Sequence, residues 1–307
     1  MGVYRRHRRG SQAQRRGVTA TLLIAPAFII YGFFFIVPLV QTAYLSFTDW
    51  NGVRSTIKFI GLDNYTRMFD DPLFWRSLRH TVIWVVVGTI APIAISLGLG
   101  MLLWPNTRGQ SVFQLIFFLP QILSTVAIGL IWAQIYSPVG GLLNESLRAV
   151  GLDSIARGWL GDPTWALWAV LVAAVWGFFG FSLVVIMAGL RNVDLDLVDA
   201  AAIDGAGAWL RFRHVIVPQL RSVLTFVTAF TLIGGFNVFD IIWVTTRGGP
   251  ANSTEVLATN LWKRAFVEND VAFGAALAMV LALISLAASV IFVYLRERVD
   301  VDRVAHV

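Results

Sequence analysis

Six long apolar stretches constrain the fold of this chain more than any other feature of its sequence. Each has at least the roughly 20 residues that a helix needs to cross the hydrocarbon of a bilayer. Lipid offers no hydrogen-bond partner to backbone N–H and C=O groups, so such stretches are expected to be helical. The prediction is an all-α, polytopic membrane helix bundle with six transmembrane helices, at approximately 18–45, 81–103, 112–135, 166–190, 223–245 and 271–295.

The composition agrees with a membrane protein. Hydrophobic residues make up 57% of the 307 positions and charged residues 14%, whereas soluble domains carry about 25% charged residues. The net charge of +6 comes almost wholly from 22 Arg against two Lys. We interpret this charge as placed beside anionic lipid headgroups rather than on nucleic acid.

The basic residues also indicate the orientation. Six arginines precede the first stretch, which is too long for the apolar part of a secretion signal and is read as a retained span. With the N-terminus inside, the inner segments hold 14 basic residues in 68 positions and the outer segments hold 10 in 90. Because cytoplasmic segments carry more Lys and Arg, both termini are predicted to be cytoplasmic. The predicted organisation is a basic tail at 1–17, a transmembrane domain at 18–295 and a second tail at 296–307.

Four prolines fall inside the first three stretches: Pro26, Pro38, Pro92 and Pro120. Proline removes a helix hydrogen bond, so each is expected to kink its span.

Sequence motifs for catalysis are absent. The chain has no cysteine, and its four histidines are scattered with no carboxylate at ligand spacing, so no metal site is expected. No Ser-His-Asp set is apparent. A Walker A loop needs Gly-Lys-Ser/Thr, yet Lys58 precedes Phe59 and Lys263 precedes Arg264. We therefore expect no catalytic residues in this chain and no cofactor bound by the chain itself.

The segment at about 192–218, between the fourth and fifth stretches, has the pattern of two short helices joined at a glycine. Asp196 is expected to cap the first helix, with Asp199 in the capping-box position. Gly205 is expected to end that helix in the left-handed conformation. A second helix at about 208–215 would lead to Pro218, which is placed to open the fifth span.

This segment resembles the cytoplasmic signature loop of binding-protein-dependent ABC importer permeases. The family pattern is Glu-Ala-Ala, then Asp-Gly-Ala, then a hydrophobic residue and Leu-Pro. Here Asp199 replaces the usual Glu and Val217 replaces the usual Leu. The matching positions are Asp199, Ala200, Ala201, Asp204, Gly205, Ala206, Phe212 and Pro218.

The resemblance implies a function for the chain. In that family the loop docks on a cytoplasmic ATPase and passes its closing motion to the membrane helices, and the eight matching residues would do so here. ATP and Mg would be used by the partner ATPase dimer. A second permease subunit would complete the passage, and an extracytoplasmic solute-binding protein would deliver the substrate. The chain would lie in the bacterial cytoplasmic membrane as a multi-pass protein.

Four further segments resemble the sugar-type branch of the same family, the maltose-type and glycerol-phosphate-type permeases. They are 59–65, 141–152, 245–254 with its Thr-x-Gly-Gly-Pro element, and 273–276. Their order along the chain implies a carbohydrate substrate.

Polar residues inside spans are costly and mark candidate substrate pathways. The main candidates are Asn237, Asp240, Gly234 and Gly235 in the fifth stretch and Gln121 and Ser124 in the third. Asp240 either lines the path or pairs at the outer interface. Gln134, Gly177, Gly180 and Ser182 are candidates too, although Ser and Gly in spans commonly serve helix packing. Trp132 and Trp176 either stack on a sugar face or pack against other helices.

An ion-coupled secondary transporter of a small polar solute is the alternative function. Such carriers commonly show internal repeats and buried charges for the coupling ions. This chain shows neither, apart from Asp240.

Overall fold

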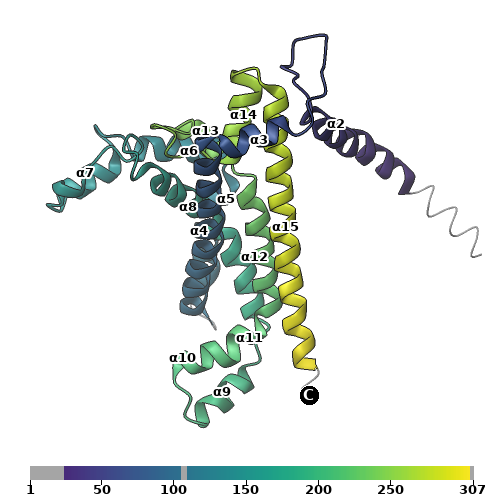
Figure 1. The fold of residues 1–307 in the computed structure, drawn as a ribbon. Coiled ribbons are helices and arrows are strands. Elements are labelled where there is room, and N and C mark those ends of the chain that lie inside the picture. The colour runs from purple at the N-terminus through teal and green to yellow at the C-terminus, as the bar shows by residue number, and fades with distance from the viewer. Residues whose placement is uncertain (1–23, 105–108, 305–307) are drawn as a thin grey trace, which may run out of the picture.

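The computed structural model describes residues 24–104 and 109–304, which are almost entirely helical (Figure 1). Within these residues the only β-type pairing is one isolated bridge between Thr48 and Phe59. The predicted tail at 1–17 lies outside the described residues. The all-α prediction is confirmed.

Four helices are long and apolar enough to cross a membrane, and there are up to six such spans if two bent helix pairs each count as one. The four are the first helix, Ile24–Leu45, which includes the π-helical turn η1 (Gly32–Ile36) and α2 (Val37–Leu45), then α4 (Pro72–Leu103), α8 (Ala166–Leu190) and α15 (Val271–Val304). The fourth predicted stretch matches α8 at both ends. Helix α15 continues past the predicted boundary at 295.

The third predicted span is not one straight helix. It consists of α5 (Gln110–Ile122) and α6 (Thr125–Ile135), which are bent by 99°. Leu123 and Ser124 have extended backbone between them, and the Ser124 side chain accepts a hydrogen bond from the N–H of Ala127 to start α6. The break is therefore capped by a side chain, and it follows the predicted kink residue Pro120 by one turn.

The fifth predicted span is also interrupted. Helix α12 (Arg221–Phe236) ends at Asn237, and a separate short helix α13 (Asp240–Thr245) follows. Gly234 and Gly235 weaken the last turn of α12 because glycine disfavours the helix interior. In contrast, α4 stays a single helix through Pro92.

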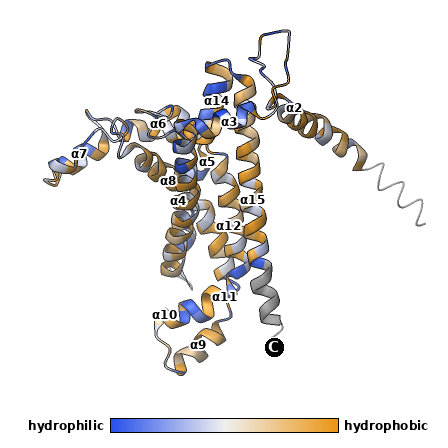
Figure 2. Cartoon of the chain, in the orientation of Figure 1, coloured by the Kyte–Doolittle hydropathy of each residue, from blue (hydrophilic) through white to orange (hydrophobic). Residues whose placement is uncertain are grey.

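The long helices α4, α8, α12 and α15 form the body of the molecule, and most of their residues are hydrophobic (Figures 1 and 2). Close packing depends on small residues, because a Cβ on Gly180 would lie 2.1 Å from the carbonyl oxygen of Phe117 in α5. One on Gly177 would lie 2.6 Å from Ile128 in α6. These two glycines in α8 therefore serve helix packing.

Short helices occupy the two ends of the body. Helices α3 (Asp63–Asp70), α7 (Leu142–Ala149) and α14 (Leu257–Trp262), with the turns η2 (Asp153–Ile155) and η4 (Lys263–Val267), lie toward one end. At the opposite end lie α9 (Leu195–Ile203), α10 (Ala208–Arg211), η3 (Phe212–Ile216) and α11 (Val217–Gln219) (Figure 1).

Candidate functional site

The loop at 192–218 has the glycine-jointed helix pair that its sequence predicts. Gly205 has a φ of +82° and follows Asp204, the C-cap of α9. The N–H of Ala206 donates to the carbonyl of Ala201 at 2.9 Å, and the N–H of Gly205 donates to that of Ala202 at 3.1 Å. These two bonds form a Schellman motif, which satisfies carbonyls that the end of α9 would otherwise leave unpaired.

The cap at the start of α9 differs from the prediction. Asp194, not Asp196, is the N-cap, and its carboxylate accepts a hydrogen bond from the N–H of Asp196 at 3.0 Å. Helix α9 thus begins one residue before Asp196, and Asp196 lies in its first turn. Asp194 is the N-cap because its backbone is extended, which is the conformation that N-cap residues adopt.

The second half of the loop is also longer than predicted. It runs through α10, η3 and α11 to Gln219, and this segment meets α12 at 74°. Pro218 lies in the first turn of α11. The proline therefore precedes the bend rather than opening the fifth span.

The loop presents apolar side chains to its surroundings. Ile203 and Trp209 have relative exposures of 87% and 65%, and Leu197 and Leu210 are also exposed. Asp199 and Asp204 are exposed as well, and in the described part of the chain neither carboxylate has a hydrogen bond or ion pair. Contiguous exposed apolar residues beside free charges are typical of a protein-docking surface.

The same loop is anchored to the long helices. Val193, Val198 and Ile216 are buried in one core cluster. That cluster also contains Leu190 of α8 and Val227 of α12. The N–H of Asp194 donates to the side-chain oxygen of Gln219 at 2.9 Å, which ties the start of the loop to its end. A force applied to the exposed face is therefore transmitted through packed side chains to two long helices.

A cavity of about 280 Å³ lies where the two broken spans, α5 with α6 and α12 with α13, meet α4 and α8. Five of the six main pathway candidates line it, although they come from separate parts of the sequence. The five are Gln121, Gly234, Gly235, Asn237 and Asp240. Phe178, Phe181 and Phe230 supply aromatic walls. The cavity thus combines amide and carboxylate groups with aromatic faces, as sites for small molecules commonly do.

The two adjacent glycines of α12 differ in their surroundings. A Cβ on Gly235 would approach the Cα of Val85 in α4 at 3.2 Å, so this glycine permits close packing. A Cβ on Gly234 would meet nothing within 4 Å. Gly234 therefore leaves backbone open to the cavity.

The polar residues of the cavity lie at helix breaks. The side chain of Asn237 donates to the carbonyl of Ile233 at 3.2 Å and closes the end of α12. Asp240 is the first residue of α13, where the helix dipole favours its negative charge. Asp240 has no ion pair within the described residues. Gln121 keeps a buried side-chain oxygen without a hydrogen-bond partner in the same part of the chain.

The remaining pathway candidates do not line this cavity. Ser124 caps α6, and its neighbour Thr125 lines the cavity instead. Gln134 is exposed on α6, and Ser182 is buried in α8. The rings of Trp132 and Trp176 pack against each other with centroids 5.7 Å apart, which fits their alternative role in helix packing.

Some lining residues were missed by the sequence reasoning. Thr231 lies three residues before Gly234 and so on the same face of α12. This three-residue spacing from Gly234 could have identified Thr231 from the sequence. Trp84 and Gly88 of α4 also line the cavity, but nothing in their sequence context distinguished them from other span residues.

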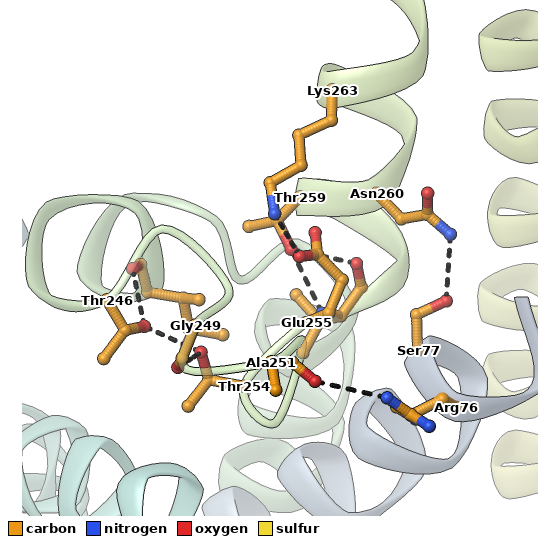
Figure 3. Close-up of polar contacts among 12 residues, drawn as sticks. Arg76, Ser77, Thr246, Gly249, Ala251, Thr254, Glu255, Thr259, Asn260 and Lys263 are labelled. Atoms are coloured by element: carbon orange, nitrogen blue, oxygen red, sulfur yellow. Dashed lines mark hydrogen bonds and ion pairs between the residues drawn. The ribbon is translucent and has the colours of Figure 1, made fainter. Parts of the chain in front are cut away.

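A cluster of polar residues surrounds the start of α14 (Figure 3), and α14 lies at the opposite end of the molecule from the loop (Figure 1). The Glu255 carboxylate is fully buried and pairs with the Lys263 ammonium. Gly248, in the Thr-x-Gly-Gly-Pro element, has a φ of +84°, and a Cβ there would lie 1.9 Å from Glu255 Oε2. The hydroxyls of Thr254 and Thr246 share a hydrogen bond of 2.7 Å, and Thr254 donates to the carbonyl of Gly249 at 2.9 Å.

Helix α4 is tied to this cluster by polar side chains. Arg76 donates to the carbonyl of Ala251 at 3.2 Å, and the Asn260 amide donates to Ser77 at 3.2 Å (Figure 3). The N–H of Leu257 donates to the hydroxyl of Thr81 at 2.9 Å. The element that resembles the sugar-type branch is therefore part of a bracket between α4 and α14. In the described residues no three His, Cys, Asp or Glu side chains gather as a metal site.

Several known proteins are similar to this chain in sequence. The family model described as "Binding-protein-dependent transport system inner membrane component" matches residues 90–301. A probable ABC transporter permease protein of Pyrococcus horikoshii is 35% identical, with 89% of this chain and 94% of that protein covered. The lactose transport system permease protein of Rhizobium radiobacter is 34% identical, with 84% and 87% covered.

Further similarity extends over nearly the full length. A probable starch degradation products transport system permease protein of Thermoanaerobacterium thermosulfurigenes is 30% identical, with 94% of this chain and 97% of that protein covered. The crystal structure of a bacterial ABC transporter involved in the import of the acidic polysaccharide alginate contains a chain with the same fold. Its TM-score is 0.79 at 20% identity, with 95% and 99% of the two chains covered.

Proposed function

Because the chain belongs to the family of binding-protein-dependent transport system inner membrane components, we propose that it forms the passage of an ATP-driven importer for a carbohydrate. The chain is a multi-pass membrane protein and a translocation component rather than an enzyme. Relatives named for lactose and for starch degradation products support a carbohydrate substrate.

The observation that carries the proposal is the exposed loop at 192–218. Its outer surface combines exposed apolar side chains with the carboxylates of Asp199 and Asp204, while its inner surface packs on α8 and α12. An ATPase that grips the exposed surface moves the inner surface with it. Ala200, Ala201 and Ala206 have small side chains, which would let the ATPase approach the loop closely. Gly205 would set the angle between the two halves of the loop.

Energy enters from another polypeptide, since the sequence contains no Walker A loop. The partner ATPase dimer would use ATP and Mg, and its closure would turn the cavity outward. An extracytoplasmic solute-binding protein would then deliver the sugar, and a second permease subunit would close the other side of the passage. The crystal structure of a bacterial alginate ABC transporter in complex with its pentasaccharide-bound periplasmic protein supports the delivery step.

The cavity at the broken helices is the proposed sugar site of this subunit. Asn237 and Gln121 would hydrogen-bond sugar hydroxyls, and the phenylalanine walls would cover the apolar face of the ring. Gly234 would let the substrate approach the backbone of α12. Asp240 would accept hydrogen bonds at the N-terminus of α13.

An ion-coupled secondary transporter is not favoured. Such a carrier needs buried charges for its coupling ion, and Asp240 is the only ionisable side chain among the described residues that line the cavity. The family match over residues 90–301 also opposes this alternative.

The decisive experiment is uptake of labelled oligosaccharides by a deletion strain that carries Gly205→Val. A β-branched residue at a φ of +82° is a steric outlier, so the loop loses its angle while the spans stay unchanged. We expect uptake to fall to background at normal membrane levels of the protein.

The matched control is Gly207→Val. Gly207 lies two residues away with a φ of −64°, and a Cβ there meets nothing within 4 Å. Uptake in this control should stay within about twofold of the wild type, since ordinary φ values suit valine. Normal uptake by the Gly205→Val strain would contradict the coupling role.

A further inference from the structure

Four aromatic residues form a series of ring contacts that begins at the wall of the proposed sugar cavity. Phe239 lines that cavity, and its ring centroid lies 5.4 Å from those of both Trp243 and Trp262. Trp262 in turn contacts Phe266, with centroids 4.4 Å apart. We call these four residues the aromatic row. We propose that the row is a second sugar subsite, which holds the further units of an oligosaccharide whose first unit lies in the cavity.

Short helices bring the row together. Phe239 is the N-cap of α13, and Trp243 lies one turn later, where its N–H donates to the carbonyl of Phe239 at 2.9 Å. Trp262 ends α14, and Phe266 follows in η4. Residues four apart lie on one face of a helix, so each segment contributes a pair of rings. The two pairs meet where Trp243 contacts Trp262, with centroids 6.3 Å apart.

Exposure increases along the row with distance from the cavity. Phe239 and Trp243 are partly buried, whereas Trp262 and Phe266 have relative exposures of 38% and 63%. The row therefore runs from the cavity wall to the surface of the chain, at the end of the molecule where α14 lies (Figure 1). A sugar chain that begins in the cavity would continue along exposed ring surface.

The row offers both apolar faces and hydrogen-bond donors. Aromatic faces cover the apolar faces of sugar rings, and the indole of tryptophan also supplies an N–H donor. Within the described residues, the indole N–H groups of Trp243 and Trp262 form no hydrogen bond, so both are free for sugar hydroxyls. In contrast, the indole N–H of Trp75 is already used, since it donates to the carbonyl of Phe69 at 2.8 Å.

The positive charges beside the row are already paired. Lys263 and Arg264 follow Trp262 directly in the chain. The Lys263 ammonium pairs with the buried Glu255 carboxylate. Arg264 pairs with Asp71 at 2.6 Å. Because neither cation is left to attract an acidic sugar, the row is suited to neutral oligosaccharides.

The row differs from an interfacial belt of aromatic residues. Tryptophan gathers at membrane interfaces, where it contacts lipid, and such residues need no ring neighbours. The four rings of the row contact one another in series and end at a cavity. Trp168 in α8 provides a comparison, because its relative exposure of 45% is close to that of Trp262 although it lies outside the row.

The test, like the inference, rests on the proposed function: a deletion strain carrying the wild type or a variant takes up labelled sugars that differ only in length. The probes are the disaccharide and tetrasaccharide of the maltose, cellobiose and chitobiose series. Trp262→Leu keeps an apolar side chain but removes the ring. We expect it to lower the uptake rate of the tetrasaccharide about fivefold relative to that of the disaccharide. Any solute-binding protein is the same in all strains, so a change in this ratio reports on the permease chain.

Three further variants separate ring stacking from membrane anchoring and from folding. Trp262→Phe retains a ring and should keep the ratio within about twofold of the wild type. Trp168→Leu removes an indole of similar exposure outside the row and should leave the ratio unchanged. Phe266→Leu changes the most exposed ring of the row and should also lower the ratio, which covers the case in which Trp262→Leu does not reach the membrane.

The outcomes distinguish this inference from the proposed function. An unchanged ratio in Trp262→Leu and in Phe266→Leu overturns the second subsite. An equal loss of uptake of both sugars in Trp262→Leu and Trp168→Leu would assign the row to membrane anchoring and also overturns it. Both results leave the proposed function intact, because the wild type still transports sugar. Failure of the wild type to take up any of the probes would contradict the proposed function itself, and the row would lose its role with it.

Discussion

Gln121 and Gln134 show how the same residue type has different consequences at different positions. Both were candidates for the substrate path, and both belong to the third apolar stretch. Gln121 lines the cavity and has a buried side-chain oxygen without a partner in the described residues. Gln134 lies on the exposed face of α6. A buried amide without a partner costs about 1–3 kcal/mol, so the Gln121 oxygen is placed to gain a hydrogen bond when a polyhydroxylated substrate enters.

This difference predicts the outcome of two alanine substitutions. Gln121→Ala should raise the apparent KM for the transported sugar by about tenfold, since one hydrogen bond to a substrate is worth about 1.4 kcal/mol. Gln134→Ala should leave that KM within about twofold. Uptake kinetics with equal amounts of each variant in the membrane measure both. Equal effects of the two substitutions would remove Gln121 from the proposed sugar site.

The helices α5, α6, α12 and α13 create the cavity by being interrupted. Each break frees backbone groups and places a polar side chain within an apolar stretch, such as Ser124 at the start of α6 or Asn237 at the end of α12. Such irregular backbone is tolerated inside a membrane protein where it lines a cavity. Helix α8 has the opposite role. It is continuous over Ala166–Leu190, and its glycines let α5 and α6 approach closely.

Because α5 and α8 lie in close contact, a single methyl group added between them should destabilise the protein. Gly180→Ala would place a Cβ 2.1 Å from the backbone oxygen of Phe117, which cannot move without shifting α5. We expect the free energy of unfolding to fall by about 1–3 kcal/mol. Gly98→Ala in α4 is the control, because a Cβ there meets nothing within 4 Å.

Thermal unfolding of the purified chain in detergent would measure both variants. The Gly98→Ala variant should be as stable as the wild type or more stable, since alanine favours helix by about 1 kcal/mol over glycine. A Gly180→Ala variant as stable as Gly98→Ala would mean that the helices do not pack this closely.

At the scale of the whole molecule, the loop and the polar bracket lie at opposite ends of the long helices (Figure 1). The distribution of arginine and lysine predicts that the loop end faces the cytoplasm. The absence of cysteine from the natural sequence makes this prediction simple to test. Ile203 in α9 and Val139 near α7 have almost equal relative exposures, 87% and 86%.

Single cysteines at these two positions should report opposite sides of the membrane. In intact cells a membrane-impermeant maleimide should label Val139→Cys and leave Ile203→Cys unlabelled. After permeabilisation of cells that lack the partner ATPase, both should react to a similar extent because their exposures in the chain itself match. Labelling of Ile203→Cys in intact cells would place the loop outside and would contradict its coupling to a cytoplasmic ATPase.

The sequence by itself determined the features that depend on local chemistry. Apolar length predicts the spans, because a helix needs a set number of residues to cross hydrocarbon. The left-handed Gly205 was predictable because glycine is the residue that enters that region at little cost. The glycine-jointed helix pair at 192–218 was predictable for a related reason, since the hydrogen bonds that end α9 join residues close in sequence. The N-cap of α9 and the length of the second half of the loop differed from the prediction.

Only the tertiary structure decided where the third and fifth spans break and which polar residues meet. Gln121 and Asp240 are separated by more than a hundred positions, yet they line one cavity, because α8 holds the two broken helices together. The Glu255–Lys263 ion pair could not be predicted from the sequence for the same reason. Its burial depends on α4 and on the turn at Gly248. Contacts of this kind depend on the packing of distant elements, and a local pattern of residues carries no record of that packing.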